Sequence, residues 1–278
     1  MDLKVDSRKA FVYTAAHALD TSLQSIVFVH GAGLDHSWWG LQSRYFGYHG
    51  WNVLACDLPG HGRSEGPALG SITEVADWVM RMLESAGIAK ASVVGHSMGS
   101  LAALECAARH PQRVERIALI GTAFPMNVSD AFLEAARNND QSAYDMETIW
   151  GHAPQVPFGA NPNPGMWMYG DSLARLARLA PGVLYTDLKA CKDYAGGLES
   201  AARVTCPAMV VTGGRDMMTP PKAAAALLNA LPKATSVSIG PSGHSLMAEA
   251  PDATLDALIE FFRVSASATS RRAALPRR

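Results

Sequence analysis

The chain has 278 residues, of which 48% are hydrophobic and 18% are charged, and its formal net charge is −1. This length and composition fit one large α/β domain, or a core domain with an insertion, with enough apolar residues for a sizeable core. The near-neutral charge, without a long basic run before the extreme C-terminus, excludes the electrostatic footprint of a nucleic-acid-binding protein.

The N-terminus and the cysteines bear on where the protein works. No apolar stretch of the secretory type follows Met1, and no apolar run approaches the roughly 18 residues of a membrane span. We therefore expect a cytoplasmic protein without a secretion signal or a membrane span. The four cysteines are scattered and form no CxxC pair, which is typical of buried thiols rather than of disulfides or zinc ligands.

Strands and helices alternate over the first 120 residues. Short apolar runs, several of them followed by a glycine-rich turn, predict strands at 9–14, 24–29, 52–56, 91–94 and 114–120. The spacing of apolar residues predicts helices around 38–46, over 72–86, and from 98 to about 109. This rhythm predicts a mostly parallel, doubly wound sheet.

The alternation breaks between about residues 122 and 204. Four helix-prone stretches and a turn-rich piece with four prolines lie there, at 130–138, 141–150, 154–164, 165–180 and 183–195. The earlier pattern then resumes, with strands at 206–212 and 235–239 and helices at 220–231 and 252–264. We expect a core of 1–122 and 204–264, a helical insertion of 123–203 over the carboxyl edge of the sheet, and a flexible tail of 265–278.

The pentapeptide Gly95-His96-Ser97-Met98-Gly99 lies between a short β-branched run and an Ala/Leu-rich helical stretch, so the order is strand, sharp turn, helix. A turn this tight strains the backbone of its central residue and needs small residues two positions away on either side, which the glycines supply. Ser97 is therefore expected at the carboxyl end of a strand, with its hydroxyl exposed.

Two further residues complete what Ser97 needs, because a serine hydroxyl attacks only when an imidazole takes its proton and a carboxylate orients that imidazole. Asp216 follows the strand 206–212 in a glycine-rich loop, and His244 follows the next strand. In a parallel sheet both loops open on the same edge as Ser97, and the chain order Ser, Asp, His is the expected one. His96 is rejected as the base, since a side chain adjacent to Ser97 on the turn points away.

Five motifs in this order resemble those of the α/β-hydrolase superfamily, over residues 23–264. They are His30-Gly31-Ala32-Gly33, Asp57-Leu58-Pro59-Gly60-His61-Gly62-Arg63-Ser64, Gly95-His96-Ser97-Met98-Gly99, Gly213-Gly214-Arg215-Asp216 and Gly243-His244. The resemblance implies an α/β-hydrolase fold with a mostly parallel, doubly wound sheet of about eight strands. It also implies that the insertion 123–203 is a helical cap that roofs the pocket.

The resemblance implies roles for individual residues: Ser97 as the nucleophile, Asp216 as the acid and His244 as the base. The backbone amides of Ala32 and Met98 would form the oxyanion hole. No cofactor is implied. Epoxide hydrolases and haloalkane dehalogenases of this fold carry an aspartate at the turn, so Ser97 excludes those activities.

The remaining histidines of the loops have structural interpretations. His30, His61 and His96 lie beside glycines in tight loops, where a histidine more often braces the backbone than transfers protons. The bunching of His30, Asp35, His36, Asp57 and His61 only partly matches a metallo-hydrolase pattern, and two separate loop motifs explain it better. We expect no metal site.

A few aromatic and methionine residues are candidates for contact with substrate. Core packing is the more frequent explanation for such residues, but pocket lining is favoured for the group at 166–169. The predicted substrate-binding residues are Trp38, Met166, Trp167, Met168 and Tyr169.

These features favour hydrolysis of a carboxylic ester of a small to medium, largely apolar substrate, through an acyl-Ser97 intermediate. Arg175, Arg178 or Lys189 could hold a carboxylate, and a cation facing the pocket would favour a hydrolase of carbon–carbon bonds in dienoate-type acids. The same residues are also compatible with a lactonase, a thioesterase or a small-molecule receptor without turnover. The expected partner is a small-molecule substrate, and a homodimer stays open.

Overall fold

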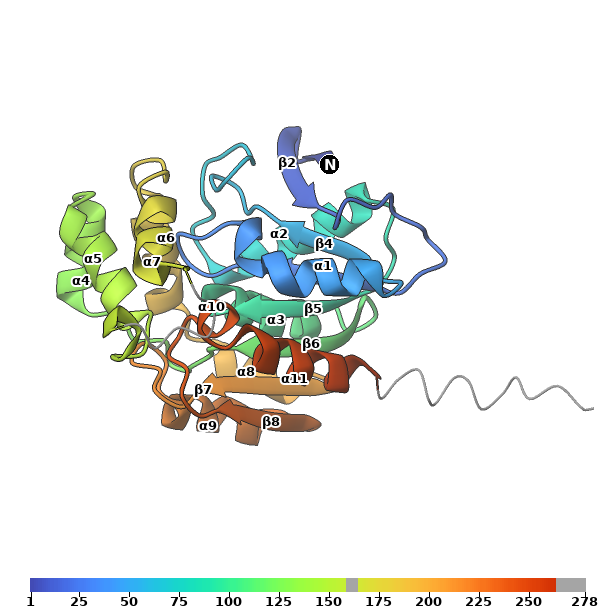
Figure 1. The fold of residues 1–278 in the computed structure, drawn as a ribbon. Helices are drawn as coiled ribbons and strands as arrows, with labels where there is room; N and C mark the ends of the chain where they lie inside the picture. Colours follow the sequence, from blue (N-terminus) through green and yellow to red (C-terminus); the bar gives the residue numbers. More distant parts are fainter. Residues whose placement is uncertain (159–164, 264–278) are drawn as a thin grey trace, which may run out of the picture.

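The computed structural model describes residues 1–158 and 165–263, which fold around one sheet (Figure 1). In these residues the sheet has eight strands in the order β1-β2-β4-β3-β5-β6-β7-β8. From β4 to β8 in that order all neighbours are parallel, whereas β1 and β2 are antiparallel at one edge. The strands are β1 (Asp2–Val5), β2 (Arg8–Tyr13), β3 (Ser25–Val29), β4 (Asn52–Cys56), β5 (Ala91–His96), β6 (Val114–Ile120), β7 (Ala208–Gly213) and β8 (Ala234–Ile239). The expected mostly parallel sheet of about eight strands is confirmed.

The inner strands β3, β4, β5 and β7 are buried along their whole length. A parallel strand covered by helices on both faces has no solvent-facing side, which explains why these sequences are uninterrupted apolar runs. The sequence does not predict β1. Only Val5 of its four residues is buried, so the strand leaves no apolar pattern in the sequence.

Helices cover both faces of the sheet (Figure 1). On one face α1 (Gly40–Tyr48), preceded by η1 (His36–Trp39), packs against α11 (Pro251–Arg263). The ring of Phe46 lies 6.0 Å from that of Phe28 in β3 and 5.6 Å from that of Phe262. The opposite layer is α2 (Ile72–Ser85), α3 (Met98–Arg109), α8 (Gly197–Arg203) and α9 (Pro221–Ala230).

The remaining helices bear on the site. The segment between β6 and β7 contains α4 (Asp130–Arg137), α5 (Gln141–Trp150), η2 (Val156–Phe158), α6 (Met168–Leu176), α7 (Val183–Asp193) and α8. Helices α4 to α7 gather beyond the end of the sheet to which β5 and β7 point (Figure 1). A short α10 (Leu246–Glu249) follows β8. No helix in the described ranges combines the length and apolar character that a membrane crossing needs.

The helices between β6 and β7 follow the expected positions closely, with two differences. The stretch 165–180 forms a shorter helix, α6, and the seven-residue α8 was not predicted, because it is short and begins at a glycine, Gly197. The expectations for 159–164, within the turn-rich piece, and for the tail 265–278 fall outside the described residues.

Candidate active site

Ser97 occupies a strained turn between β5 and α3, with φ +52° and ψ −119°. A Cβ atom on Gly95 would collide with the carbonyl of Gly99, and a Cβ atom on Gly99 would collide with the carbonyl of Val29 in β3. Both flanking positions therefore have to be glycine for the strand, the turn and the helix to pack. The strain at Ser97 is held by these close approaches.

Two backbone amides lie next to this turn. Met98 is the first residue of α3, so its N–H group has no partner within the helix, and the positive end of the helix dipole lies beside Ser97. Ala32 follows β3 and lines the same cavity as Ser97. A Cβ atom on the preceding Gly31 would lie 3.2 Å from Cβ of Ser97, which shows how closely this loop approaches the turn.

Asp216 and His244 meet in the loops that follow β7 and β8. Nδ1 of His244 donates to Oδ2 of Asp216 over 2.8 Å, and the hydroxyl of Thr219 donates to the same oxygen over 2.7 Å. The amides of Met218 and Thr219 donate to Oδ1 of Asp216 over 2.9 and 2.7 Å. With its proton on Nδ1, neutral His244 keeps Nε2 free to accept a proton.

The charges of this pair support each other. Burial alone would raise the pKa of Asp216, but the charge and hydrogen bond of His244 and the donors of Thr219 lower that pKa to about 2. Burial lowers the pKa of His244, and the charge and hydrogen bond of Asp216 outweigh it, so the pKa lies above its usual value. Asp216 is therefore ionised at every working pH.

The ring of His244 lies against the ends of β5 and β6. Its centroid is 4.6 Å from that of His96, whose Nε2 donates to the carbonyl oxygen of His244 over 2.9 Å. Burial lowers the pKa of His96 far below its usual value, so His96 is neutral and braces the loop that carries His244. Directly after β6, Gly121 has φ +57°, and a Cβ atom there would lie only 3.1 Å from the ring of His244.

Ser97 opens on a cavity of about 290 Å³ beneath α4, α5 and α7. Its wall is mostly apolar and comes from segments far apart in the chain. The described lining residues are Ala32, Ser97, Met126, Asn127, Val128, Ser129, Phe132, Glu147, Trp150, Leu188, Cys191, Met217, Met218 and Thr219.

The five predicted substrate-binding residues lie elsewhere in the described structure. Trp38 is buried against His96 at a ring distance of 5.8 Å, and Met168 packs in a small separate core. Tyr169 contacts the ring of His152, while Met166 and Trp167 are 47% and 73% exposed. None of the five belongs to the described lining of the Ser97 cavity. That wall is built by α4, α5, α7 and the loops after β3, β6 and β7, whereas Trp38 lies in η1 and the other four lie at or just before the start of α6.

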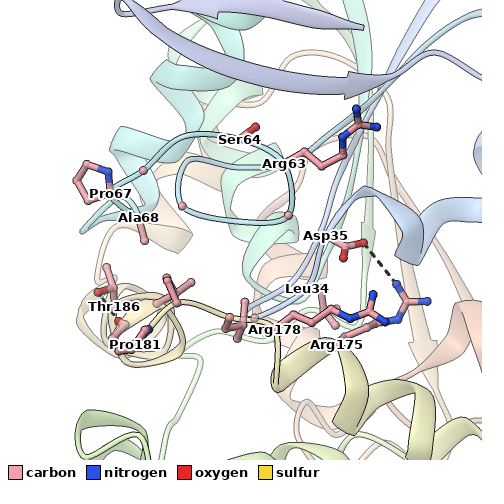
Figure 2. Close-up of a pocket in the computed structure, with 18 of the residues that line it drawn as sticks. Leu34, Asp35, Arg63, Ser64, Pro67, Ala68, Arg175, Arg178, Pro181 and Thr186 are labelled. Atoms are coloured by element: carbon pink, nitrogen blue, oxygen red, sulfur yellow. Dashed lines mark hydrogen bonds and ion pairs between the residues drawn. The ribbon is translucent and has the colours of Figure 1, made fainter.

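A second, larger cavity of about 890 Å³ lies between α7, the loop that precedes it, and the loops after β3 and β4 (Figure 2). Arg63, Arg175 and Arg178 line it. Arg175 pairs with Asp171 over 2.9 Å and with Asp35 over 3.4 Å. The cations considered for a substrate carboxylate are thus outside the Ser97 cavity, and Lys189 forms a surface pair with Asp193.

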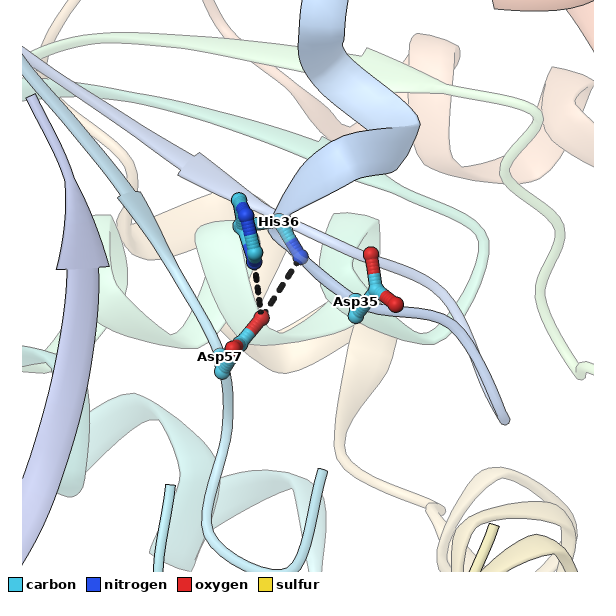
Figure 3. Close-up of side chains that lie close together, drawn as sticks. All are labelled: Asp35, His36 and Asp57. Atoms are coloured by element: carbon cyan, nitrogen blue, oxygen red, sulfur yellow. Dashed lines mark hydrogen bonds and ion pairs between the residues drawn. The ribbon is translucent and has the colours of Figure 1, made fainter. Parts of the chain in front are cut away.

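Asp35, His36 and Asp57 place one potential metal ligand each within 4.8 Å of one another (Figure 3). Oδ1 of Asp57 accepts from both the amide and Nδ1 of His36 at 2.7 Å, and its Oδ2 accepts from the amide of Arg63 at 2.8 Å. Asp35 caps η1 through the amide of Ser37. Hydrogen bonds within the protein thus already engage these three side chains, and those between His36 and Asp57 fasten the loop after β3 to the loop after β4.

His30 and His61 also brace these loops. His30 donates from Nδ1 to the carbonyl of Gly31 over 2.8 Å and accepts the amide of Leu58 at Nε2 over 3.1 Å. Burial, with the nearby charge of His61, lowers the pKa of His30 to about 4, so it is neutral. His61 pairs through Nε2 with Oδ2 of Asp187 in α7 over 2.8 Å. The sequence gives no sign of Asp187, an isolated acid in a helix.

Known proteins resemble this chain in sequence and in fold. A sequence model of the Alpha/beta hydrolase family matches residues 26–257. The chain is 24% identical over 235 residues to the (E)-2-((N-methylformamido)methylene)succinate hydrolase of Acinetobacter baylyi, covering 82% of this chain and 86% of that protein. It is 30% identical over 207 residues to the pimeloyl-(acyl-carrier protein) methyl ester esterase of Chromobacterium violaceum, covering 69% and 76%. The enol-lactonase from Burkholderia xenovorans LB400 shares the fold, with a TM-score of 0.83 at 22% identity over 95% of this chain and 100% of that one.

Proposed function

The chain belongs to the alpha/beta hydrolase family and is a hydrolase, and from this premise we propose that it cleaves a carboxylic ester of a small to medium, largely apolar substrate through an acyl-Ser97 intermediate. In the first step His244 takes the proton of the Ser97 hydroxyl at Nε2, and the Ser97 oxygen attacks the ester carbonyl. Asp216 holds the imidazole in the required tautomer and stabilises the imidazolium.

The tetrahedral intermediate carries its negative charge on the former carbonyl oxygen, for which the amides of Ala32 and Met98 are the proposed donors. Each such donor contributes about 3–4 kcal/mol to the transition state. Collapse breaks the bond to the leaving alkoxide, which receives the proton from His244. Water then attacks the acyl-Ser97 ester, with His244 again as the base, and releases the acid.

One observation carries this proposal: Ser97, on its strained turn, and Thr219 line the same apolar cavity. Thr219 donates a hydrogen bond to Asp216, which in turn pairs with His244. The apolar wall suits an uncharged ester. The pimeloyl-(acyl-carrier protein) esterase among the relatives acts on a methyl ester, which agrees with that chemistry.

Hydrolysis of an acidic substrate is the second candidate, because one relative is named for a succinate. Such a substrate needs a cation near Ser97. Among the described residues that line the cavity there is no lysine or arginine, and the described carboxyl there, Glu147, would repel it. The ester of an uncharged acid therefore ranks first.

The test is a panel of p-nitrophenyl esters of rising acyl length, with lactones and thioesters beside them. Wild type should turn over repeatedly, and Ser97→Ala should lose at least about 10⁴-fold in kcat. Ser142→Ala, which removes an exposed hydroxyl from α5, serves as the control and should keep its rate. Wild-type rates in Ser97→Ala, or loss of activity to EDTA instead, would contradict the serine mechanism.

A further inference from the structure

Glu147 is the only acidic residue in the described lining of the Ser97 cavity. The residue is half-buried, but its Oε2 atom is fully buried, and no residue that the structure describes donates a hydrogen bond to that atom. Two hydroxyls of the wall are engaged within the protein: Thr219 donates to Asp216, and Ser129 accepts an amide in the first turn of α4. Glu147 is thus a polar group that the described part of the fold leaves unsatisfied.

A carboxyl oxygen that is buried without a hydrogen bond is unfavourable in either protonation state. Burial raises the pKa of Glu147 to about 7, while the positive charge of His244 acts in the opposite direction. Because native proteins leave few buried polar groups unpaired, an unpaired carboxyl oxygen on a residue that lines a cavity favours a partner in that cavity, which the carboxyl can reach by turning about its Cγ–Cδ bond. The mechanism above gives Glu147 no part in the chemistry.

The surroundings of Glu147 restrict that partner. Trp150 follows it by three residues on α5, so both lie on the same side of the helix, and both line the cavity. The ring of Trp150 meets that of Phe132 edge-on at 5.7 Å. An aromatic wall with one carboxyl suits a hydrogen-bond donor, including an ammonium group, and opposes a second carboxylate.

We propose that Glu147 sets the substrate class of this site: its carboxyl accepts a hydrogen bond from an N–H or O–H group that the ester carries, and it disfavours an ester with a carboxylate in the same place. The proposal rests on the ester hydrolase function proposed above. It assigns substrate selection to Glu147, a residue of the segment between β6 and β7 that takes no part in bond cleavage.

The first test uses p-nitrophenyl esters of matched length that end in methyl, hydroxyl, ammonium or carboxylate. Wild type should prefer a donor-bearing ester over the methyl ester by about tenfold in kcat/KM. Glu147→Leu should abolish that preference, and Glu134→Gln, at an exposed acid in α4, should keep it. Glu147→Gln distinguishes a hydroxyl donor from an ammonium donor on the substrate. The variant retains a neutral acceptor for a hydroxyl but loses the negative charge that an ammonium group needs. Equal preferences in wild type and Glu147→Leu would overturn the proposal.

The second test needs no turnover, so it separates this proposal from the proposed function. Calorimetry of Ser97→Ala should find that 1-hexanol or hexylammonium binds about tenfold more tightly than hexanoate, and that adding Glu147→Leu removes the difference. Circular dichroism verifies that the double variant is folded. If wild type hydrolyses no ester but the binding preference holds, the function fails and the role of Glu147 stands; if hexanoate binds as tightly as hexanol and hexylammonium, the role of Glu147 is refuted.

Discussion

Replacing Asp187 with alanine should destabilise the fold far more than any surface change on the same helix. Two donors meet at one oxygen here: Oδ2 of Asp187 receives Nε2 of His61 over 2.8 Å and the amide of Gly33 over 2.9 Å. The side chains of Asp187 and His61 are each only 2% exposed. The variant would leave a buried imidazole and a buried amide without their acceptor.

The expected loss follows from that burial. Removing one partner of a buried ion pair costs about 3–5 kcal/mol, because the other charge stays in a poorly solvated place. Asp187→Asn keeps an oxygen that can accept both donors but loses the negative charge, so its loss should be about 1–3 kcal/mol. Asp193→Ala is the matched control: Asp193 lies on the same helix, is 57% exposed and pairs with Lys189, so less than about 1 kcal/mol is expected.

Urea unfolding followed by circular dichroism measures these differences. With a slope of about 3 kcal/mol/M, Asp187→Ala should lower the midpoint by about 1 M or more. Burial lowers the pKa of His61, but the charge of Asp187 outweighs it and the pKa is raised. The protonated pair therefore stabilises the fold fully below the unfolded pKa of about 6.5 and loses this contribution as the pH rises through the folded pKa. Equal losses of unfolding free energy for Asp187→Ala and Asp193→Ala would refute the reasoning. So would a stability difference between wild type and Asp187→Ala that grows as the pH rises.

Three further predictions concern the Ser97 region. Thr219→Val removes the hydroxyl that donates to Asp216, so kcat/KM for an ester at neutral pH should fall by about tenfold, whereas an unchanged rate would show that the amide donors suffice. Gly99→Ala should give no folded protein by circular dichroism, because its methyl group would collide with a carbonyl of β3, whereas Gly40→Ala, with open space around it, should fold normally. The kcat/KM of wild type should rise with pH, with its midpoint at the raised pKa of His244. Asp216→Asn should move the midpoint of this profile to lower pH, because the carboxylate that favours the imidazolium is gone. A midpoint that stays in place would contradict the interaction between Asp216 and His244.

The sequence was most informative where the backbone leaves no choice. Strands such as β5 and β7 are buried on both faces, so their residues have to be apolar throughout. The turn at Ser97 requires glycine at two fixed positions, and no other residue type could replace them. Asp216 and His244 follow parallel strands, and strand direction alone brings their loops to one edge. These features depend on local geometry and chain direction, which a single sequence records.

The lining of the cavity could not be predicted in the same way. Whether Phe132 in α4 or Trp167 just before α6 lines the Ser97 cavity depends on how whole helices lie against the sheet, and both are large aromatic residues of the same segment. Glu147 and Asp187 are single acids on helices that carry further charged residues. The burial of Asp187 and of Oε2 of Glu147 results from packing between distant segments, so no spacing in the sequence distinguishes these residues from solvent-exposed acids.

Helix α7 links the stability prediction to catalysis. One side of this helix contributes Leu188 and Cys191 to the Ser97 cavity, and another side lines the larger cavity. Asp187 fastens the helix to the amide of Gly33, which directly follows Ala32. If Ala32 donates to the oxyanion, loosening this contact should lower kcat more than it raises KM. Asp187→Asn should retain more activity than Asp187→Ala when both are assayed without urea, at a temperature where both are folded. A change confined to KM would show that α7 shapes the pocket without positioning the loop.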